Sequence, residues 1–366
     1  MKILHFNVFK HLLPGIKHQL IDEQHVAQLL PTGIEWSTIV YSLDPPTLPF
    51  MMQANIPKAT YLPKRLINYL SLKIQAYSWL LENQHRYDVI LLRYSTGDPF
   101  LLLNAKRLER FITVHHTLEH HEALAAAGII GYLHSKFDQV AAPYILNKTI
   151  GIIAVTNEIR RYEIERTKYN NTSTTSPNGI VILPSTHLVD KRTTKKVKIA
   201  FIASTFLPWH GLDIVLEQFK SSDLPVELEI IGQVSQALRI DDKRLTYHGT
   251  LDKEGISLVL NDVDIGLSCF ALERKGMTEA CTLKVREYLN NGIPVYANHD
   301  DSALPNDFPY YINQSFSLEH AYIMANKFKS LSRQQIRDAS TKFIDKKNQM
   351  DALVIWIKST LVKQYR

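Results

Sequence analysis

Cysteine is scarce in this chain of 366 residues, and that scarcity excludes two classes of protein. Only Cys269 and Cys281 are present, and they form no Cys-x-x-Cys pair. A disulfide-stabilised scaffold and a zinc site built from thiolates are therefore ruled out. The composition fits the reducing cytoplasm, and we expect Cys269, in an apolar strand, to be a core residue.

Long apolar runs, a cleavable leader and a strong charge imbalance are also missing. No run of eighteen apolar residues occurs, so we expect no transmembrane helix. The first residues, MKILHFNVFKHLLPG, have polar interruptions and no small-residue cleavage site, which favours a first β-strand over a signal peptide. The net charge of +6 suits solubility, phosphate ligands or an anionic membrane surface, but it is too small for a nucleic-acid-binding arm.

Short apolar runs alternate with amphipathic segments along the whole chain. Those of the first half are KILHFNV, IEWSTIVY, YDVILLRY, RFITVH and TIGIIAVT, and those of the second are VKIAFIA, VELEIIG, RLTYHG, VDIGLSCF and IPVYAN. This pattern predicts α/β architecture with two Rossmann-like, doubly wound parallel-sheet lobes. We place the N-terminal lobe at 1–185 and the C-terminal lobe at 186–347, joined by a polar linker with a cationic run from Lys191 to Lys198. The helix 348–366 has an apolar stripe and is expected to pack back on the first lobe.

The segment LPKRLINYLSLKIQAYSWLLENQ has apolar residues at helical spacing, with Lys64, Arg65 and Lys73 among them. It is either a helix facing the core or a basic amphipathic helix that touches an anionic membrane.

The stretch EACTLKVREYLNNGIPVYA is the most informative part of the sequence. Glu279 and Glu287 stand eight positions apart, with Glu287 inside a predicted helix and Glu279 in the loop before it. A helix N-terminus facing the carboxyl end of a strand is where open α/β sheets bind phosphate groups. A nucleotide diphosphate would suit this position.

These residues resemble the E-x7-E and G-x-P-V motifs of glycosyltransferase family 4, the retaining nucleotide-sugar-dependent enzymes of GT-B fold. Three further stretches are similar to the same family, in the same order: RFITVHHT, SPNGIVI and FIASTFLPWHGLDIVLEQF. The resemblance implies two lobes that face each other across a cleft, and a helix N-terminus in place of a divalent metal and of any cofactor.

The resemblance also implies roles for individual residues. Glu287 would bind the ribose, Glu279 the transferred sugar, and the backbone N–H groups of Thr282 and Leu283 the diphosphate. His115 would lie near the reacting centre on the acceptor side, with His116 as the competing assignment. The remaining nucleotide-sugar contacts are assigned to Gly15, Ser204, Thr205, His210, Gly232, Arg274 and Lys284.

The sequence departs from the family where an arginine and a lysine usually bind the leaving diphosphate. Ser204 and His210 stand there, so we expect Arg274, Lys275 or Lys284 to supply charge and His210 to take part in catalysis. The N-lobe loop has a single Gly15, with Lys17 beside it, where the family often has two glycines. Cys281, in the phosphate loop, is small enough to lie near the ligand.

Two patterns suggest a metal site, and neither is persuasive. His116 and His120 have helical i, i+4 spacing in HHTLEHHE, but the H-E-x-x-H order is absent, so a solvated helix face is favoured. Asp262 and Asp264 form an Asp-x-Asp pair at the start of a buried strand, where a strand-capping role is favoured.

We therefore expect a retaining hexosyltransferase that moves sugar from a UDP- or GDP-sugar to a glycan or a polyprenyl-diphosphate-linked acceptor. The expected setting is bacterial surface polysaccharide synthesis, in the cytoplasm or at the inner membrane face. Two alternatives stay open and a third is disfavoured. A non-catalytic nucleotide-sugar-binding homologue and a GT-B sugar-nucleotide epimerase stay open, whereas a Rossmann oxidoreductase is disfavoured because no G-x-G-x-x-G follows the first strand.

Overall fold

The computed structural model describes residues 1–57, 63–118, 128–169, 171–182, 188 and 196–364. The chain divides into two compact units, Met1–Ser176 with Met350–Arg366, and Pro177–Gln349. The first boundary lies before the expected 185/186 because the segment after Ser176 is bonded into the second unit: Ile180 N–H donates to Ile344 O over 2.9 Å. Most of the expected linker, with Lys191, lies outside the described residues.

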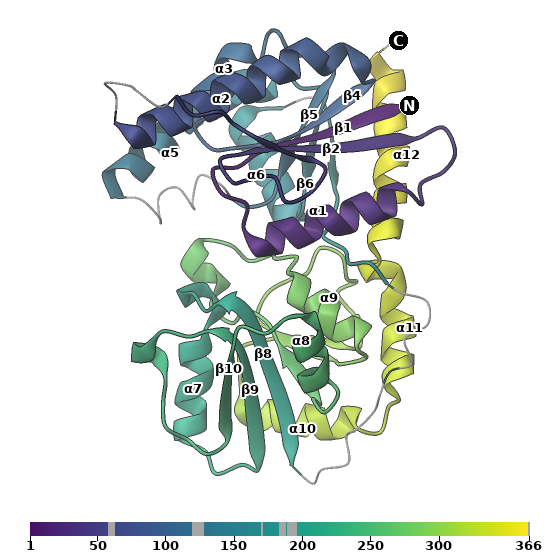
Figure 1. Ribbon diagram of the computed structural model, residues 1–366. Coiled ribbons are helices and arrows are strands. Elements are labelled where there is room, and N and C mark those ends of the chain that lie inside the picture. The colour runs from purple at the N-terminus through teal and green to yellow at the C-terminus, as the bar shows by residue number, and fades with distance from the viewer. Residues whose placement is uncertain (58–62, 119–127, 170, 183–187, 189–195, 365–366) are drawn as a thin grey trace. The chain divides into compact units, whose positions relative to one another are not determined.

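Unit 1 contains a parallel sheet of seven described strands in the order β3-β2-β1-β4-β5-β6-β7 (Figure 1). Its strands are β1 (Lys2–Val8), β2 (Glu35–Ser42), β3 (Met51–Gln53), β4 (Val89–Arg93), β5 (Phe111–His115), β6 (Gly151–Ala154) and β7 (Thr172–Thr175). Its helices are α1 (Pro14–Ala27), α2 (Lys64–Asn83), α3 (Pro99–Asn104), α5 (Gly128–Leu146) and α6 (Asn157–Thr167), together with most of α12 (Lys346–Gln364).

The C-terminal helix α12 contributes to the core of unit 1. Val354 and Ile357 are buried in one apolar cluster with Ile3 of the first strand. A Cβ on Gly151 would lie 2.8 Å from the ring of Trp356, so the absence of a side chain in β6 lets the helix approach the sheet closely. Residues of α12 therefore complete the apolar core around β1.

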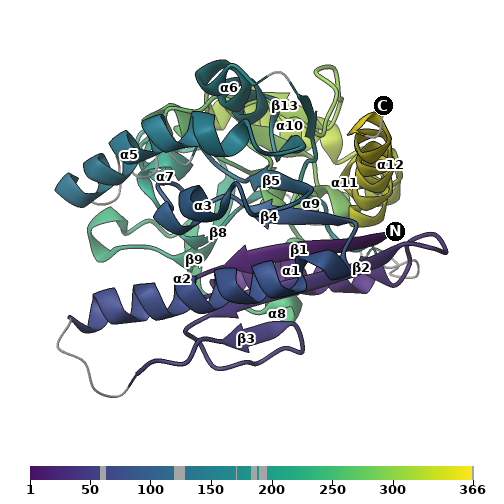
Figure 2. The same ribbon diagram turned by 90° about the horizontal axis from the view of Figure 1, so that it is seen from above.

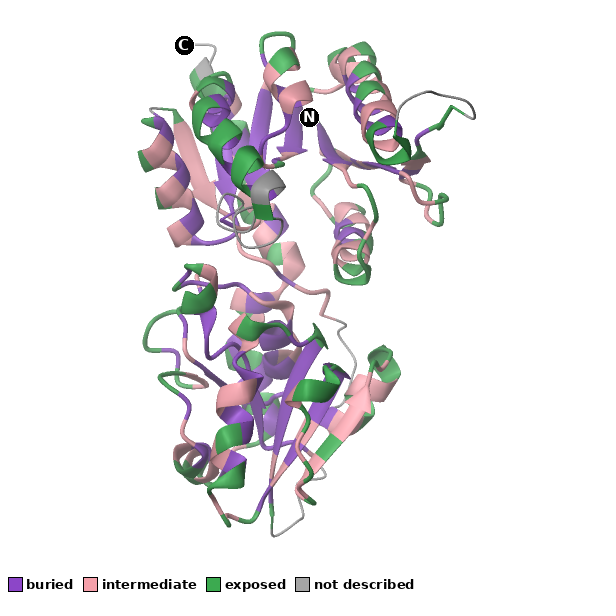
Figure 3. Cartoon of the chain, turned by 90° about the vertical axis from the view of Figure 1, so that its left-hand side faces the viewer, coloured by how far each residue is buried: buried purple, intermediate pink, exposed green. Residues whose placement is uncertain are grey.

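Unit 2 contains a parallel sheet of six described strands in the order β10-β9-β8-β11-β12-β13. Its strands are β8 (Val197–Thr205), β9 (Val226–Gln233), β10 (Leu245–Gly249), β11 (Ile265–Leu267), β12 (Val295–Ala297) and β13 (Tyr311–Asn313). Its helices are α7 (Leu212–Lys220), α8 (Lys253–Leu260), α9 (Leu283–Asn290), α10 (Leu318–Phe328) and α11 (Arg333–Ile344). Figure 3 shows that the central strands are buried and that the helices carry exposed residues on their outer faces.

Both sheets have the doubly wound order, which creates a switch point where successive connections leave toward opposite faces. It lies between β1 and β4 in unit 1 and between β8 and β11 in unit 2. Open parallel sheets bind ligands beyond the carboxyl ends of the strands at such a point. A binding site is therefore expected at the loops that follow these strands.

Helix α2 faces the core with one side, and its basic residues are divided between that side and solvent. Lys73 is buried and donates to Asp98 Oδ2 over 2.7 Å, and Tyr77 donates to the same oxygen. Lys73 therefore presents no charge to a membrane, while Lys64 and Arg65 are exposed. No helix in the described ranges is long and apolar enough to span a bilayer.

Candidate functional site

In unit 2 the loops after β8 and β11 lie side by side at the switch point. Phe270 N–H, in the loop after β11, donates to His210 O, in the loop after β8, over 3.0 Å. The β11 loop leads to helix α9, which begins at Leu283 with Thr282 as its N-cap. The loop after β8 that carries His210 is thus bonded to the loop that leads into α9.

The first turn of α9 has free capacity to bind an anion. Thr282 makes no capping hydrogen bond to the helix, because its hydroxyl lies 3.3 Å from Ser268 Oγ instead. The first N–H groups of a helix have no partner inside it, and the helix dipole favours negative charge there. An N-cap side chain usually accepts a hydrogen bond from one of these N–H groups, but that of Thr282 is bonded to Ser268 instead.

Lys284 lies in this same turn and is buried, with 9% of its surface exposed. Its Nζ has no hydrogen-bond partner among the described residues and lies 5.2 Å from the centroid of the Phe201 ring. Burial lowers the pKa of its ammonium below the ordinary value. A buried amine without a hydrogen-bond partner is costly, and this makes Lys284 a candidate for binding an anion.

His210 is held in a neutral form. Its Nδ1 accepts the N–H of Leu207 over 2.9 Å, so the ring proton lies on Nε2, which is left as a donor. Burial, followed by the charges of Lys284 and Lys275, lowers the pKa of His210 to about 3. A phosphate group nearby would oppose this shift.

A chain of polar groups beneath the first turn of α9 was not expected from the sequence. His299 Nδ1 lies 3.0 Å from Asp300 O, a carbonyl that only accepts, so the ring proton is on Nδ1. Nε2 then accepts from Ser268 Oγ over 3.1 Å, and this leaves the Ser268 oxygen to accept from Thr282. His299 therefore holds the Thr282 hydroxyl away from the helix through Ser268.

The two glutamates of the E-x7-E motif differ in burial. Glu279 is 7% exposed, its Oε2 accepts from Ser302 Oγ over 2.8 Å, and the neighbouring Ala280 N–H donates to Asp300 O. Glu287 is partly exposed on α9 and lies three residues after Lys284, which places both on one helix face.

Cys281, in the loop before α9, is held by contacts within unit 2. It is buried, and its Sγ accepts the N–H of Asn178 over 3.0 Å and an N–H of Arg286 over 2.7 Å. Arg286, fully buried, also forms a two-pronged ion pair with Asp301. Burial raises the pKa of Cys281 to about 12, so the thiol is protonated and structural.

Other predicted donor-side residues are placed less centrally. Arg274 is already paired with Asp213 through both terminal nitrogens, at 2.9 and 2.8 Å. Ser204 and Thr205 are exposed at the end of β8. Gly232 has φ +125°, and a Cβ there would lie 1.5 Å from the carbonyl oxygen of Ala203, so this glycine is required by backbone packing.

In unit 1, His115 ends strand β5 but is completely buried. Its ring stacks on Tyr94 with centroids 4.6 Å apart, and Nδ1 lies 3.6 Å from Glu163 Oε1. Burial lowers the pKa of His115. His116 is partly exposed, whereas His120 lies outside the described residues.

Gly15 lies in the first turn of α1, and nothing within 4 Å would meet a Cβ added to it. The space beside this helix start is open to a ligand. The neighbouring Lys17 donates from Nζ to Thr47 Oγ1 over 3.0 Å.

The Asp-x-Asp pair is used to hold strands together. Asp264 Oδ2 accepts the backbone N–H of Lys198 over 2.8 Å, and Asp262 accepts from the ammonium of the same lysine over 2.5 Å. In the described part of the chain no three His, Cys, Asp or Glu side chains are grouped to hold a metal ion.

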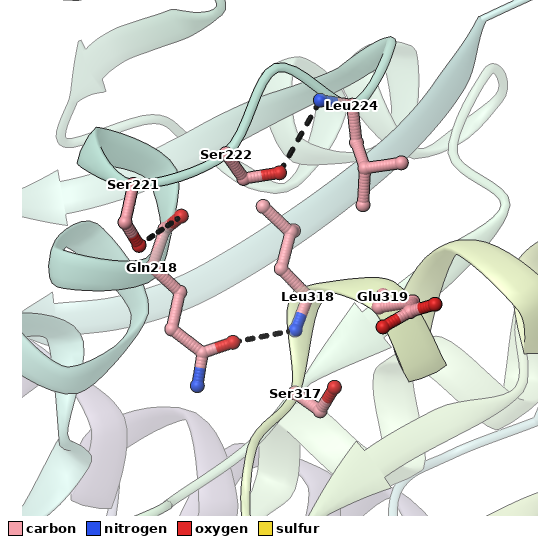
Figure 4. Close-up of a pocket in the computed structure, with 7 residues that line it drawn as sticks. All are labelled: Gln218, Ser221, Ser222, Leu224, Ser317, Leu318 and Glu319. Carbon is pink, nitrogen blue, oxygen red and sulfur yellow. Dashed lines mark hydrogen bonds between the residues drawn. The ribbon is translucent and has the colours of Figure 1, made fainter.

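A pocket of about 390 Å³ lies elsewhere in unit 2, between the end of α7 and the start of α10 (Figure 4). Gln218 Oε1 accepts the N–H of Leu318 over 2.7 Å at its edge. None of the predicted site residues lines it. The lining residues are Gln218, Ser221, Ser222, Leu224, Ser317, Leu318 and Glu319.

No protein-family model matches the sequence, and no curated protein matches it either. Solved structures do match over nearly the whole chain. The lipopolysaccharide outer core galactosyltransferase WaaB is 13% identical with a TM-score of 0.62, covering 98% of this chain and 100% of that one. HepE of Anabaena, solved with UDP and glucose, is 14% identical with a TM-score of 0.61, covering 97% and 99%.

A protein of Listeria monocytogenes assigned as a UDP-N-acetylglucosamine 2-epimerase is also similar, at 13% identity and a TM-score of 0.52, covering 98% of this chain and 96% of that one. The likeness extends through both α/β units. The chain therefore has the GT-B fold.

Proposed function

We propose that this protein is a nucleotide-sugar-dependent glycosyltransferase whose donor diphosphate binds at the first turn of α9. The observation that carries the proposal is the buried ammonium of Lys284 beside a helix start whose N-cap hydroxyl is turned away. A diphosphate supplies the negative charge and acceptor oxygens that both features lack. The similarity to a galactosyltransferase and to a protein solved with UDP and glucose agrees with this choice.

The donor would extend from this turn in two directions. Glu287 would accept hydrogen bonds from the ribose hydroxyls, and Glu279, fixed by Ser302, would contact the transferred sugar. His210 would donate from Nε2 to the leaving phosphate, since its Nδ1 is already occupied. Ser204, Thr205 and the backbone of Gly15 are secondary donor contacts in this proposal.

Transfer would proceed with retention, by attack of the acceptor hydroxyl on the face from which the diphosphate leaves. The leaving phosphate oxygen takes the acceptor proton, so no strong protein base is needed. Catalysis then depends on stabilising the charge that develops on the diphosphate. Lys284, the α9 N–H groups and His210 supply that stabilisation without a divalent metal.

The acceptor side is assigned to His115, which ends β5, or to His116, which follows it. Because His115 is fully buried, its side chain would position the loop, and the partly exposed His116 is the better placed of the two for contact with a ligand. The turnover of His115→Asn and of His116→Asn separates the loop-positioning role of the first histidine from the ligand-contact role of the second. The acceptor class proposed is a glycan or polyprenyl-diphosphate-linked sugar of a bacterial surface polysaccharide.

The direct test is a thermal-shift panel with UDP-, GDP-, ADP- and TDP-sugars. A ligand bound only by the folded protein raises the melting temperature by mass action. We expect one nucleotide class to shift the wild type and a smaller shift in Lys284→Met, with Lys220→Met, an exposed lysine of α7, as the matched control. No shift with any donor would reject the proposal.

An epimerase is the second candidate, because one similar structure is assigned as a sugar-nucleotide epimerase. An epimerase releases or interconverts the sugar without an acceptor. Appearance of an epimerised sugar in a donor-only incubation would therefore favour it over transfer. Donor binding with neither reaction would indicate a non-catalytic nucleotide-sugar-binding protein.

A further inference from the structure

Helix α5 is apolar on both of its faces, although only one of them is covered. Ala142, Ile145 and Leu146 are buried in the core of unit 1. On the opposite side Leu133, Phe137, Val140 and Tyr144 follow one another at spacings of three and four residues, and all are exposed, Val140 by 79%. A helix that is apolar all round is normally buried on every side.

Helix α3 extends the same surface. It packs between α2 and α5, as Figure 2 shows, and its Leu103 is 73% exposed. We call this the α5 surface; its apolar members are Leu103, Tyr132, Leu133, Phe137, Val140 and Tyr144.

Within the described residues of α3 and α5 the exposed charged side chain is that of Lys136, while Lys106 and Lys148 lie just beyond the ends of these helices and the exposed acid Glu109 lies three residues after Lys106. Lys136 Nζ lies 5.6 Å from the Tyr132 ring centroid, and Lys106 and Lys148 lie 5.8 and 5.9 Å from that of Tyr144. The only acid in α5, Asp138, is buried and bound by Tyr94, Gly97 and Arg166. Exposed acids are thus absent from the described faces of both helices.

From this pattern we infer that the α5 surface binds an anionic lipid bilayer. Tyrosine rings beneath lysine ammonium groups, next to Leu and Val, match the interface between headgroups and acyl chains. A second copy of the chain fits poorly, because a self-complementary contact would place these lysines against one another, and the described residues of α3 and α5 present no exposed acid to balance them. The inference goes beyond donor chemistry, and it assigns membrane contact to α5 instead of the segment at 64–73.

The experiment is co-sedimentation of the full-length protein with phosphatidylcholine vesicles, with and without phosphatidylglycerol. We expect binding to the anionic vesicles, weaker binding to neutral ones, and loss of binding at high salt. Val140→Glu and Leu133→Glu should abolish it. Each lysine near an anionic surface contributes about fivefold in affinity, so replacing all three with glutamine should weaken binding on the order of 100-fold.

The matched control is Leu258→Glu, which places the same charge on a 69% exposed leucine of α8 in unit 2. It should bind vesicles like the wild type, and the melting temperature of each variant shows that it is folded. The inference is overturned if the wild type does not bind anionic vesicles, or if Val140→Glu binds them as well as the wild type does. Vesicle-independent dimerisation that Val140→Glu abolishes would overturn it as well, by identifying a second copy as the partner.

This test is separate from that of the proposed function. Vesicle binding requires no nucleotide, and Val140→Glu should retain the donor-induced thermal shift. If the protein fails to bind vesicles but a donor still raises its melting temperature, only the lipid inference is rejected. If it binds vesicles but no donor raises its melting temperature, only the glycosyltransferase proposal is rejected.

Discussion

Replacing Lys284 with methionine should stabilise the ligand-free protein and weaken its binding of a nucleoside diphosphate. The ammonium is buried and has no hydrogen-bond partner among the described residues. Methionine keeps most of the side-chain volume and removes the unsatisfied group, whose burial costs about 1–3 kcal/mol. The free energy of unfolding should therefore rise by about that amount or stay unchanged.

The effect on binding should have the opposite sign. A hydrogen bond between a charged amine and a phosphate contributes about 1.5–3 kcal/mol, so the Kd for UDP or GDP should increase by roughly 10- to 150-fold. The free nucleoside, which lacks phosphate, should bind both proteins equally. Isothermal titration calorimetry measures both constants, and chemical denaturation measures stability.

The pH dependence provides an independent check on the charge. Burial lowers the pKa of Lys284 in the free protein, and a bound phosphate raises it. Between these two values binding takes up a proton, so affinity for the diphosphate should fall as pH rises through that window. Lys284→Met should lack this fall. Unchanged diphosphate affinity in the variant, or a loss of stability of several kcal/mol, would refute the assignment of Lys284 as an anion-binding residue.

Five other substitutions test separate parts of the structure. Gly232→Ala should cost more than about 4 kcal/mol, since its Cβ would overlap a carbonyl oxygen, whereas Gly15→Ala should melt like the wild type and affect only donor binding. The pKa of His210 is lowered from 6.5 to about 3, so protons favour the unfolded chain and stability is lost as pH falls from 6.5 toward 3, by up to roughly 1.4 kcal/mol per pH unit. Denaturation curves of His210→Gln across that range should be flatter. Arg286→Met should cost about 3–5 kcal/mol by leaving Asp301 buried and unpaired, and Asp301→Asn in the same chain should recover part of it.

Periodicity predicted the architecture well because buried parallel strands are marked along the sequence itself. Runs such as VKIAFIA and VELEIIG became adjacent strands β8 and β9, and the helix after Glu279 begins at Leu283. These are local signals, in which a short segment determines its own structure.

Contacts between distant residues could not be predicted in the same way. His299 reaches Ser268 across 31 residues, and Asn178 reaches Cys281 across 103, with no motif that relates them. The burial of His115 likewise depends on Tyr94 and on Glu163 of α6. The domain boundary differed for the same reason, because hydrogen bonds from the segment after Ser176, not its polarity, decide to which unit it belongs.

The path of the chain has a consequence for its synthesis. Unit 2 is a continuous segment, but unit 1 is built from two segments separated by it. On the ribosome, Ile3 and its neighbours are made before unit 2, whereas Val354 and Ile357, which pack against them, are made after it. The core around β1 is therefore completed only after unit 2 has been synthesised, and until then its uncovered apolar residues are open to chaperones or to aggregation.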